Sequence, residues 1–473
     1  MYLKSSMKNQ FKRKIYAFFS SEKYALFFSA TYASIIGTLF YPGLLYSDSV
    51  ARWNTAILLA NNGIDALASV SDHHPIFPIF IMSFFYKITG EIGLFSLIQV
   101  FIFSLSLFFI VRHYSPSLAG NFFASLTLML PVNQVYSIFV SYDSLFSVFM
   151  GLLILAFLSK SKAKVLLIPL LLAALVGTRL NSIVIVPVVV TFAFFRQFGL
   201  TLSQRCVTGL LCVLSVSFTL TLPAVLGMSK GNSWLIGTAW EYANLATKTH
   251  DKRDVSFLKS FGTSPEDIIG GVCYHGIWCG KEREAFIDRV PNERGTELLR
   301  QYALVAKDHP AIFFDEKLKY IKSLMGVGYK LQNAEIGRWR ESSWRDAMKS
   351  LHFETSEKKE KLIDLYFRFS DSEGRFLFRP WLIFFILAIS AFALQRHEKK
   401  TVLMTLIPIV YYMSFFISSQ NHEFRYFYPV VFILMAYLSA LSAMYGNQLY
   451  SKLRNSSLFC ESRMDTLKKC TQH

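Results

Sequence analysis

Carboxylates and guanidinium groups stand at the ends of several long apolar runs in this sequence. Asp48 lies in YPGLLYSDSVARWN, Asp143 in SYDSLFS, Arg179 in GTRLNS and Arg425 in NHEFRYFYP. Ionisable side chains this close to a bilayer are costly unless they are hydrated or paired, so they are candidates for function. A carboxylate can take a proton from an attacking hydroxyl, and a guanidinium can bind a departing phosphate. These residue types therefore indicate group transfer from a phosphate at a membrane surface.

Each of these residues also has a structural explanation. Asp48 or Asp143 could cap the helix that follows it, because an Asp side chain accepts hydrogen bonds from free N–H groups. Arg425 could anchor a helix end at the interface, among tyrosines. Asp72 and His73 could serve only to keep a loop hydrated. The shared placement of acids and guanidinium groups on one membrane face favours the functional interpretation.

Composition predicts the elements that must position these residues. The chain has 473 residues, of which 53% are hydrophobic and 45 are Phe. The apolar residues come in blocks long enough to cross a hydrocarbon core, which takes ~20 residues as a helix. We therefore expect an all-α polytopic membrane protein with about ten transmembrane helices. The predicted spans are 24–45, 92–112, 118–138, 143–159, 164–178, 181–196, 206–227, 379–395, 401–418 and 427–446.

The net charge of +17 reflects the predicted topology rather than a nucleic-acid partner. Lys and Arg in short loops mark the cytoplasmic side. An amino terminus in the cytoplasm puts every short basic loop, and the basic carboxyl tail, on that side. The region 164–196 could form one span or two. The segment 74–90 is short and carries Pro75 and Pro78, so we expect it to lie in the interface rather than to span.

The opposite face then receives a long first loop, residues 46–91, with interfacial helices, and a large polar segment. We divide the chain into four parts. They are a transmembrane module of about seven spans at 1–227, a mostly α-helical periplasmic domain at 228–378, a module of about three spans at 379–446, and a cytoplasmic tail at 447–473.

Two cysteines fall in the predicted periplasmic domain, within GGVCYHGIWCG. Cys273 and Cys279 could form a disulfide there, because an oxidising compartment permits one. A metal site with His275 is the alternative, although no fourth ligand is evident. We expect the disulfide and predict no metal site from the sequence.

The order of the motifs resembles the membrane glycosyltransferases of the GT-C superfamily. YPGLLYSDS resembles the acidic motif of their first outer loop, with Asp48 in the position of the catalytic Asp. DHHPIFPIFIMSFFYKITG looks like the H/K-P-P segment, with Ile76 in place of the second Pro. SYDSLFS resembles the acid of the second outer loop, VGTRLNSIVIVP the basic residue before a span, and FRYFYPVV the RY-x-x-P element. The resemblance covers roughly residues 1–200 and 419–473.

The resemblance implies a function and roles for individual residues. Size and domain order are similar to bacterial and phage enzymes that decorate the O-antigen of lipopolysaccharide. Such a protein would transfer glucose or a similar sugar from undecaprenyl phosphate, with inversion, on the periplasmic face of the inner membrane. Asp48 would be the base, and Trp240 and Tyr242 would contact the acceptor glycan, unless these aromatic residues form the core of their domain. The residues expected to bind donor sugar or phosphate are His74, Asp143, Arg179, His422 and Arg425.

Other functions stay open at this point. An O-antigen polymerase or ligase would use a diphosphate-linked glycan on the same face. A flippase or transporter would carry ionisable residues at mid-membrane depth, whereas these acids lie near one surface. An enzyme that modifies protein hydroxyls is a further alternative. No glycine-rich nucleotide loop is present, in keeping with a lipid-linked donor. A single Asp48 stands where the resembling family has an acidic pair, which weakens the case for a metal-binding Asp-Glu pair in the first loop. A requirement for a divalent cation is left open.

Overall fold

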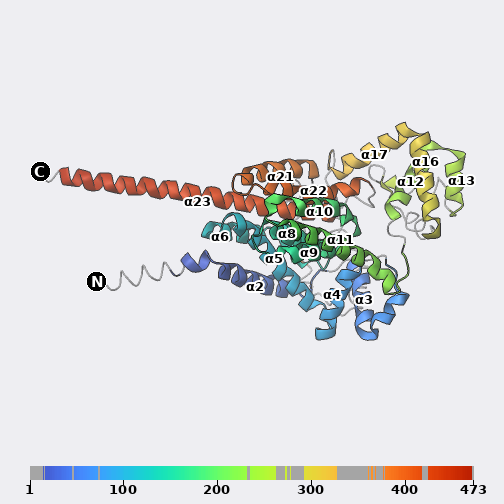
Figure 1. Cartoon of the computed structure of the whole chain (residues 1–473), viewed down its shortest axis with the longest axis horizontal. Coiled ribbons are helices and arrows are strands. Elements are labelled where there is room, and N and C mark those ends of the chain that lie inside the picture. Colours follow the sequence, from blue (N-terminus) through green and yellow to red (C-terminus); the bar gives the residue numbers. More distant parts are fainter. Residues whose placement is uncertain are drawn as a thin grey trace.

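The computed structural model is built almost entirely from helices (Figure 1). It describes residues 16–44, 47–72, 75–231, 235–262, 272–273, 277–278, 292–327, 379–417 and 424–470, together with residues 14, 361, 364–365, 368 and 377. Side chains are described for most of these residues, with Asp48, Trp240, Cys273 and the end of the last helix among the exceptions. The predicted all-α class is confirmed for this part of the chain.

Each predicted span overlaps helical structure. The helices at the predicted spans of the first module are α2 (Glu22–Leu39), α5 (Gly93–Tyr114), α6 (Leu118–Leu128), α7 (Pro131–Ile138), α8 (Tyr142–Leu158), α9 (Lys164–Thr178), η2 (Leu180–Ile185), α10 (Val186–Phe194) and α11 (Leu202–Val225). Those of the second module are α21 (Pro380–Gln395), α22 (Thr401–Met413), η5 (Ser414–Phe416) and α23 (Phe424–Cys470).

Three helical segments among the described residues are long and apolar enough to cross a membrane by themselves: Gly93–Tyr114, Leu202–Val225 and Phe424–Leu449. The other apolar helices are shorter. The stretch 118–138, predicted as one span, is two helices, because Leu130 is extended before Pro131 and a residue before proline disfavours the α conformation. The stretch 181–196 begins as the 3-10 helix η2 and becomes α-helical only at Val186. A membrane protein is thus supported, and the number of ten spans stays a prediction.

The bundle is organised around α5, which packs against α2, α8 and α23. Of the three long apolar segments, the one at the start of α23 is the most enclosed: 83% of its most apolar stretch is buried, against 22% for α11. α11 packs on α9 and α10 and leaves Leu210 and Phe218 exposed. In a membrane protein such a face contacts lipid, so these exposed side chains need no protein partner.

The two ends of the bundle differ (Figure 1). α2 begins, and α23 extends, at one end. At the other end lie α3 (Ser47–Asn62), η1 (Ile64–Ser69) and α4 (Ile76–Thr89) of the first loop, together with helices of the polar domain. This agrees with a topology in which α2 starts and α23 ends on one side and the two polar segments lie on the other. Which end faces the cytoplasm stays a prediction.

The polar domain has a separate core. Its described helices are α12 (Ile236–Thr249), α13 (Lys252–Lys259), η4 (Asn292–Arg294), α16 (Gly295–Asp308) and α17 (Pro310–Leu324), and β1 (Val272–Cys273) pairs antiparallel with β2 (Ile277–Trp278). Apolar side chains of α12, α13 and α16, such as Ala243, Leu258 and Val305, form a cluster distinct from that of the bundle. α17 lies between this cluster and the end of the bundle (Figure 1).

Candidate functional site

A buried ion pair joins two of the residues that the sequence singled out. Asp143, the second residue of α8, pairs with the guanidinium of Arg179, the residue that follows α9. The Asp143 side chain has no exposed surface, and that of Arg179 is 8% exposed. Asp143 is not the helix cap: Ser141 is, and its hydroxyl accepts a hydrogen bond from the Ser144 N–H at 3.3 Å. The carboxylate is therefore held by a cation and not by the helix start.

Two further arginines lie in the same cluster. Arg52 of α3 is fully buried, and its guanidinium carbon lies 4.0 Å from the ring centroid of Tyr142. Arg425, the second residue of α23, is 6% exposed and donates a hydrogen bond to the Tyr426 hydroxyl at 3.4 Å. Both arginines interact electrostatically with the Asp143 carboxylate. Among the described side chains, three arginines thus interact with one carboxylate.

Aromatic rings enclose the Arg179 guanidinium. Its central carbon lies 4.6 Å from the Tyr142 centroid, 4.7 Å from that of Tyr426 and 5.7 Å from that of Phe415. Phe415 and Tyr426 stack on each other with centroids 4.9 Å apart and planes 6° from parallel. Rings of this kind attract the cations through their faces and keep water away, which strengthens every electrostatic contact in the site.

Hydrogen bonds hold together the starts of two helices that contribute to the cluster, α3 and α8. Leu44, just before α3, forms a parallel bridge with Phe139, just before α8, through Leu44 N–H to Ile138 O at 3.1 Å and Val140 N–H to Leu44 O at 2.9 Å. The Ser49 hydroxyl donates to Val140 O. Gln99 of α5 donates to Ser137 O at 3.0 Å and to Phe139 O at 2.6 Å. The first turn of α3, which contains Asp48, is therefore tied to the start of α8, which contains Asp143.

The cluster also gathers helix N-termini. α8 begins at Tyr142 and α23 at Phe424, each one residue before a charged member of the cluster. Helix N-termini carry partial positive charge and free N–H groups, so they add to the attraction for an anion. The arrangement is suited to holding an anionic group, with one internal carboxylate that offsets part of the arginine charge.

Several predicted site residues lie outside the described residues. His73, His74, His422 and Cys279 do so entirely, and the side chains of Asp48, Trp240 and Cys273 do so as well. The expected disulfide between Cys273 and Cys279 and the role of Asp48 therefore stay predictions. Cys206 and Cys212, in α11, are free thiols.

Asp72 has a structural role. Its backbone N–H donates to Ser229 O at 2.9 Å, and its carboxylate accepts a hydrogen bond from the Gly231 N–H. Asp72 thus ties the first loop to the chain that leaves α11 for the polar domain.

Tyr242 was expected to contact an acceptor glycan, but its side chain is fully buried in the core of the polar domain. Its ring packs edge-on against Phe257, with centroids 5.5 Å apart, and its hydroxyl donates to Asp254 at 3.3 Å. Burial raises the pKa of the Tyr242 hydroxyl well above its usual range. The ring presents no surface to a glycan, so the acceptor role is wrong in this structure and the aromatic-core explanation holds.

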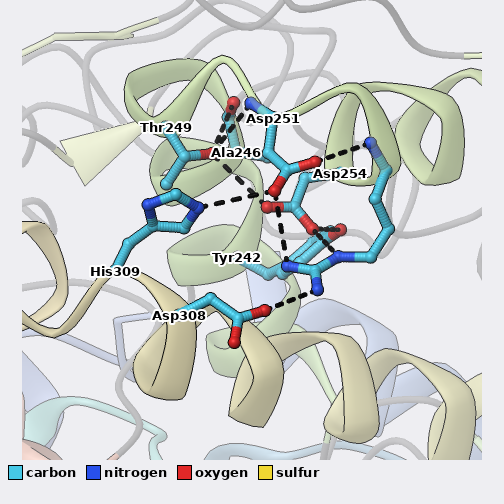
Figure 2. Close-up of polar contacts among 8 residues, drawn as sticks. Tyr242, Ala246, Thr249, Asp251, Asp254, Asp308 and His309 are labelled. Atoms are coloured by element: carbon cyan, nitrogen blue, oxygen red, sulfur yellow. Dashed lines mark hydrogen bonds and ion pairs between the residues drawn. The ribbon is translucent and has the colours of Figure 1, made fainter.

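Asp251, Asp254 and His309 bring three ligand atoms within 4.8 Å of one another (Figure 2). The carboxylate of Asp254 is nevertheless already paired with Arg253, whose guanidinium lies 3.1 Å from Asp254 and 2.7 Å from Asp308. The backbone N–H of Arg253 donates to Asp251 at 2.8 Å and is the main reason why the pKa of that carboxyl is lowered. The group is best explained as an ion-pair network that joins α13 to the end of α16.

Arg52 is the member of the cluster that the sequence reasoning missed. A signal for it was present, because Arg52 follows Asp48 by four residues and so shares its helix face.

Comparison of the chain with protein-family models and with curated proteins gave no match.

Proposed function

We propose that the protein is an inverting glycosyltransferase that moves a hexose, glucose or a similar sugar, from undecaprenyl phosphate to a glycan acceptor such as the O-antigen of lipopolysaccharide. The observation that carries the proposal is the buried cluster in which Arg179 pairs with Asp143 and Arg52 and Arg425 interact electrostatically with the same carboxylate. Such a cluster favours a phosphate over a neutral ligand, because bound negative charge offsets the excess of arginine charge.

The proposed reaction assigns a task to each group. The acceptor hydroxyl gives its proton to the Asp48 carboxylate and its oxygen attacks the anomeric carbon. The bond from that carbon to the phosphate oxygen breaks, and the electron pair leaves with the phosphate. The arginines stabilise the charge that develops on the phosphate. Asp143 holds Arg179 in place, and His74 and His422 stay candidates for contacts with the sugar.

The location supports an enzyme more than a transporter. The cluster lies where α8 and α23 begin, beside the first-loop helix α3, and so at one end of the bundle. A lipid phosphate has its reactive carbon at such a membrane surface, whereas a transport pathway requires polar groups across the bilayer. We assign this end to the periplasmic face of a bacterial inner membrane, with both termini cytoplasmic.

The test is transfer of labelled sugar by the purified full-length protein in nanodiscs. Mono- and diphosphate forms of the undecaprenyl-linked sugar are supplied as donors, with lipopolysaccharide as acceptor. We expect transfer from the monophosphate and its loss in Asp48→Asn, with normal membrane insertion of the variant.

Three results would contradict the proposal. Use of the diphosphate alone would indicate a polymerase or ligase. Near-normal transfer by Asp48→Asn would show that Asp48 is not the base. Transfer from neither donor by the unaltered protein would exclude the reaction.

A further inference from the structure

A partly buried lysine links the polar domain to the wall of the anion site. Lys317 of α17 donates to both carboxylate oxygens of Glu241 of α12, at 2.8 and 2.6 Å. The Tyr302 hydroxyl of α16 donates to the same carboxylate at 2.5 Å. The Lys317 ammonium also donates to Ile417 O at 2.6 Å. One ammonium group therefore connects the helices of the polar domain to the residue that follows η5 in the bundle.

Ile417 stands two residues after Phe415. Phe415 stacks on Tyr426, and both rings contact the Arg179 guanidinium. The path from Lys317 to the site thus consists of one hydrogen bond, a single turn of helix and a stacked ring pair.

We propose that Lys317 is a positioning residue, which holds η5 so that Phe415 and Tyr426 stand against Arg179. Its link to the polar domain would couple the position of that domain to the geometry of the phosphate site. The coupling rests on the proposed function, whereas the positioning of η5 does not.

Other contacts hold α17 in place without Lys317. At its carboxyl end, the Tyr412 hydroxyl donates to Leu324 O at 2.7 Å and the Trp381 N–H donates to Met325 O at 3.2 Å. Glu316 accepts a hydrogen bond from Asn244 of α12 at 3.0 Å. Phe415 of η5 is buried and packs on Tyr411 and Tyr412, so loss of the bond from Lys317 to Ile417 should loosen the end of η5 without detaching it and should leave α17 docked.

Four variants of the full-length protein in nanodiscs separate positioning from stability. Lys317→Met removes the contacts to both Glu241 and Ile417. Glu241→Gln keeps the lysine and its bond to Ile417. The double variant avoids a buried carboxylate without a cation, which is the main reason why a single substitution could harm folding. Lys319→Met is the matched control on the same helix, because Lys319 is exposed and pairs only with neighbouring acids of α17 in the described part of the chain.

Two measurements are made on each variant: hydrogen exchange of the backbone amides in residues 411–417, and binding of undecaprenyl phosphate. We expect Lys317→Met and the double variant to exchange faster in this segment and to bind about ten-fold more weakly, the effect of one charge-assisted hydrogen bond. Glu241→Gln and Lys319→Met should bind within about two-fold of the unaltered protein.

Equal losses in Glu241→Gln and Lys317→Met, with recovery in the double variant, would overturn the proposal, since only the pairing inside the polar domain would then matter. Unchanged exchange at 411–417 in Lys317→Met would overturn it too. If the unaltered protein binds no undecaprenyl phosphate while exchange still rises in both variants that lack Lys317, the positioning role holds and the proposed donor is wrong.

Discussion

The charges in the arginine cluster predict that replacing Asp143 lowers the free energy of unfolding more than replacing its ion-pair partner Arg179. Replacing Arg179 by Gln leaves Asp143 with two nearby guanidinium groups, those of Arg52 and Arg425. Replacing Asp143 by Asn leaves three buried or nearly buried guanidinium groups without their carboxylate. Removing one partner of a buried pair typically costs about 3–5 kcal/mol of unfolding free energy. We expect about 3 kcal/mol for Arg179→Gln and about 5 kcal/mol for Asp143→Asn, in line with about 4 kcal/mol for unit charges ~4 Å apart at an effective dielectric constant of about 20.

The assay is the free energy of unfolding of the full-length protein in mixed micelles with increasing SDS, with and without inorganic phosphate. Phosphate should restore part of the loss in Asp143→Asn, up to about 2.7 kcal/mol at a concentration 100-fold above its dissociation constant, because it replaces the missing negative charge. Arg300→Gln, at an exposed position of α16, is the control and should stay within about 0.5 kcal/mol. A cost for Arg179→Gln equal to or above that for Asp143→Asn, or no response of Asp143→Asn to phosphate, would refute this reasoning.

Two further predictions concern the polar domain. Tyr242→Phe removes the hydrogen bond to Asp254 and should lower the free energy of unfolding by about 1 kcal/mol; a change in the KM for the acceptor without a change in stability would contradict the core role. Asp251→Asn tests a carboxyl whose pKa is lowered by the Arg253 N–H and, less strongly, by His309. A carboxyl with a lowered folded pKa stabilises the protein above its ordinary pKa of 3.8 and loses that effect as the pH falls through the folded pKa. The difference in stability between Asp251→Asn and the unaltered protein should therefore be present at pH 6 and vanish as the pH falls below that ordinary value; a difference that persists unchanged in acid would contradict the assignment.

Helices of this protein could be predicted from the sequence because their apolar runs are long and their ends are marked by Pro, Gly and basic residues. The same pattern did not show that 118–138 is broken, since Pro131 can stand in the first turn of a helix as readily as between two spans. The span count depends on the tilt and depth of short helices such as α4 and α22, and those follow from packing and from the bilayer.

Part of the candidate site was also predictable. Asp143, Arg179 and Arg425 were chosen because each is a charge at the end of an apolar run, and the structure brings them together. Arg52 was missed because one charge within an amphipathic helix looks like ordinary surface. Tyr242 was misplaced because the composition of a soluble domain does not tell a buried ring from an exposed one. Burial of that kind is decided by contacts between distant helices, which a single sequence does not state.

The bridge between Leu44 and Phe139 has a consequence for how the protein meets its membrane. It joins two chain segments at the level of the arginine cluster, and Gln99 and Ser49 reinforce it from α5 and α3. The starts of α3 and α8 are thus registered against each other by the chain itself and not by the lipid. In a thicker or thinner bilayer the acyl chains must stretch or compress to match the bundle. The distance between the two helix starts, and so between the backbone positions of Asp48 and Asp143, stays the same.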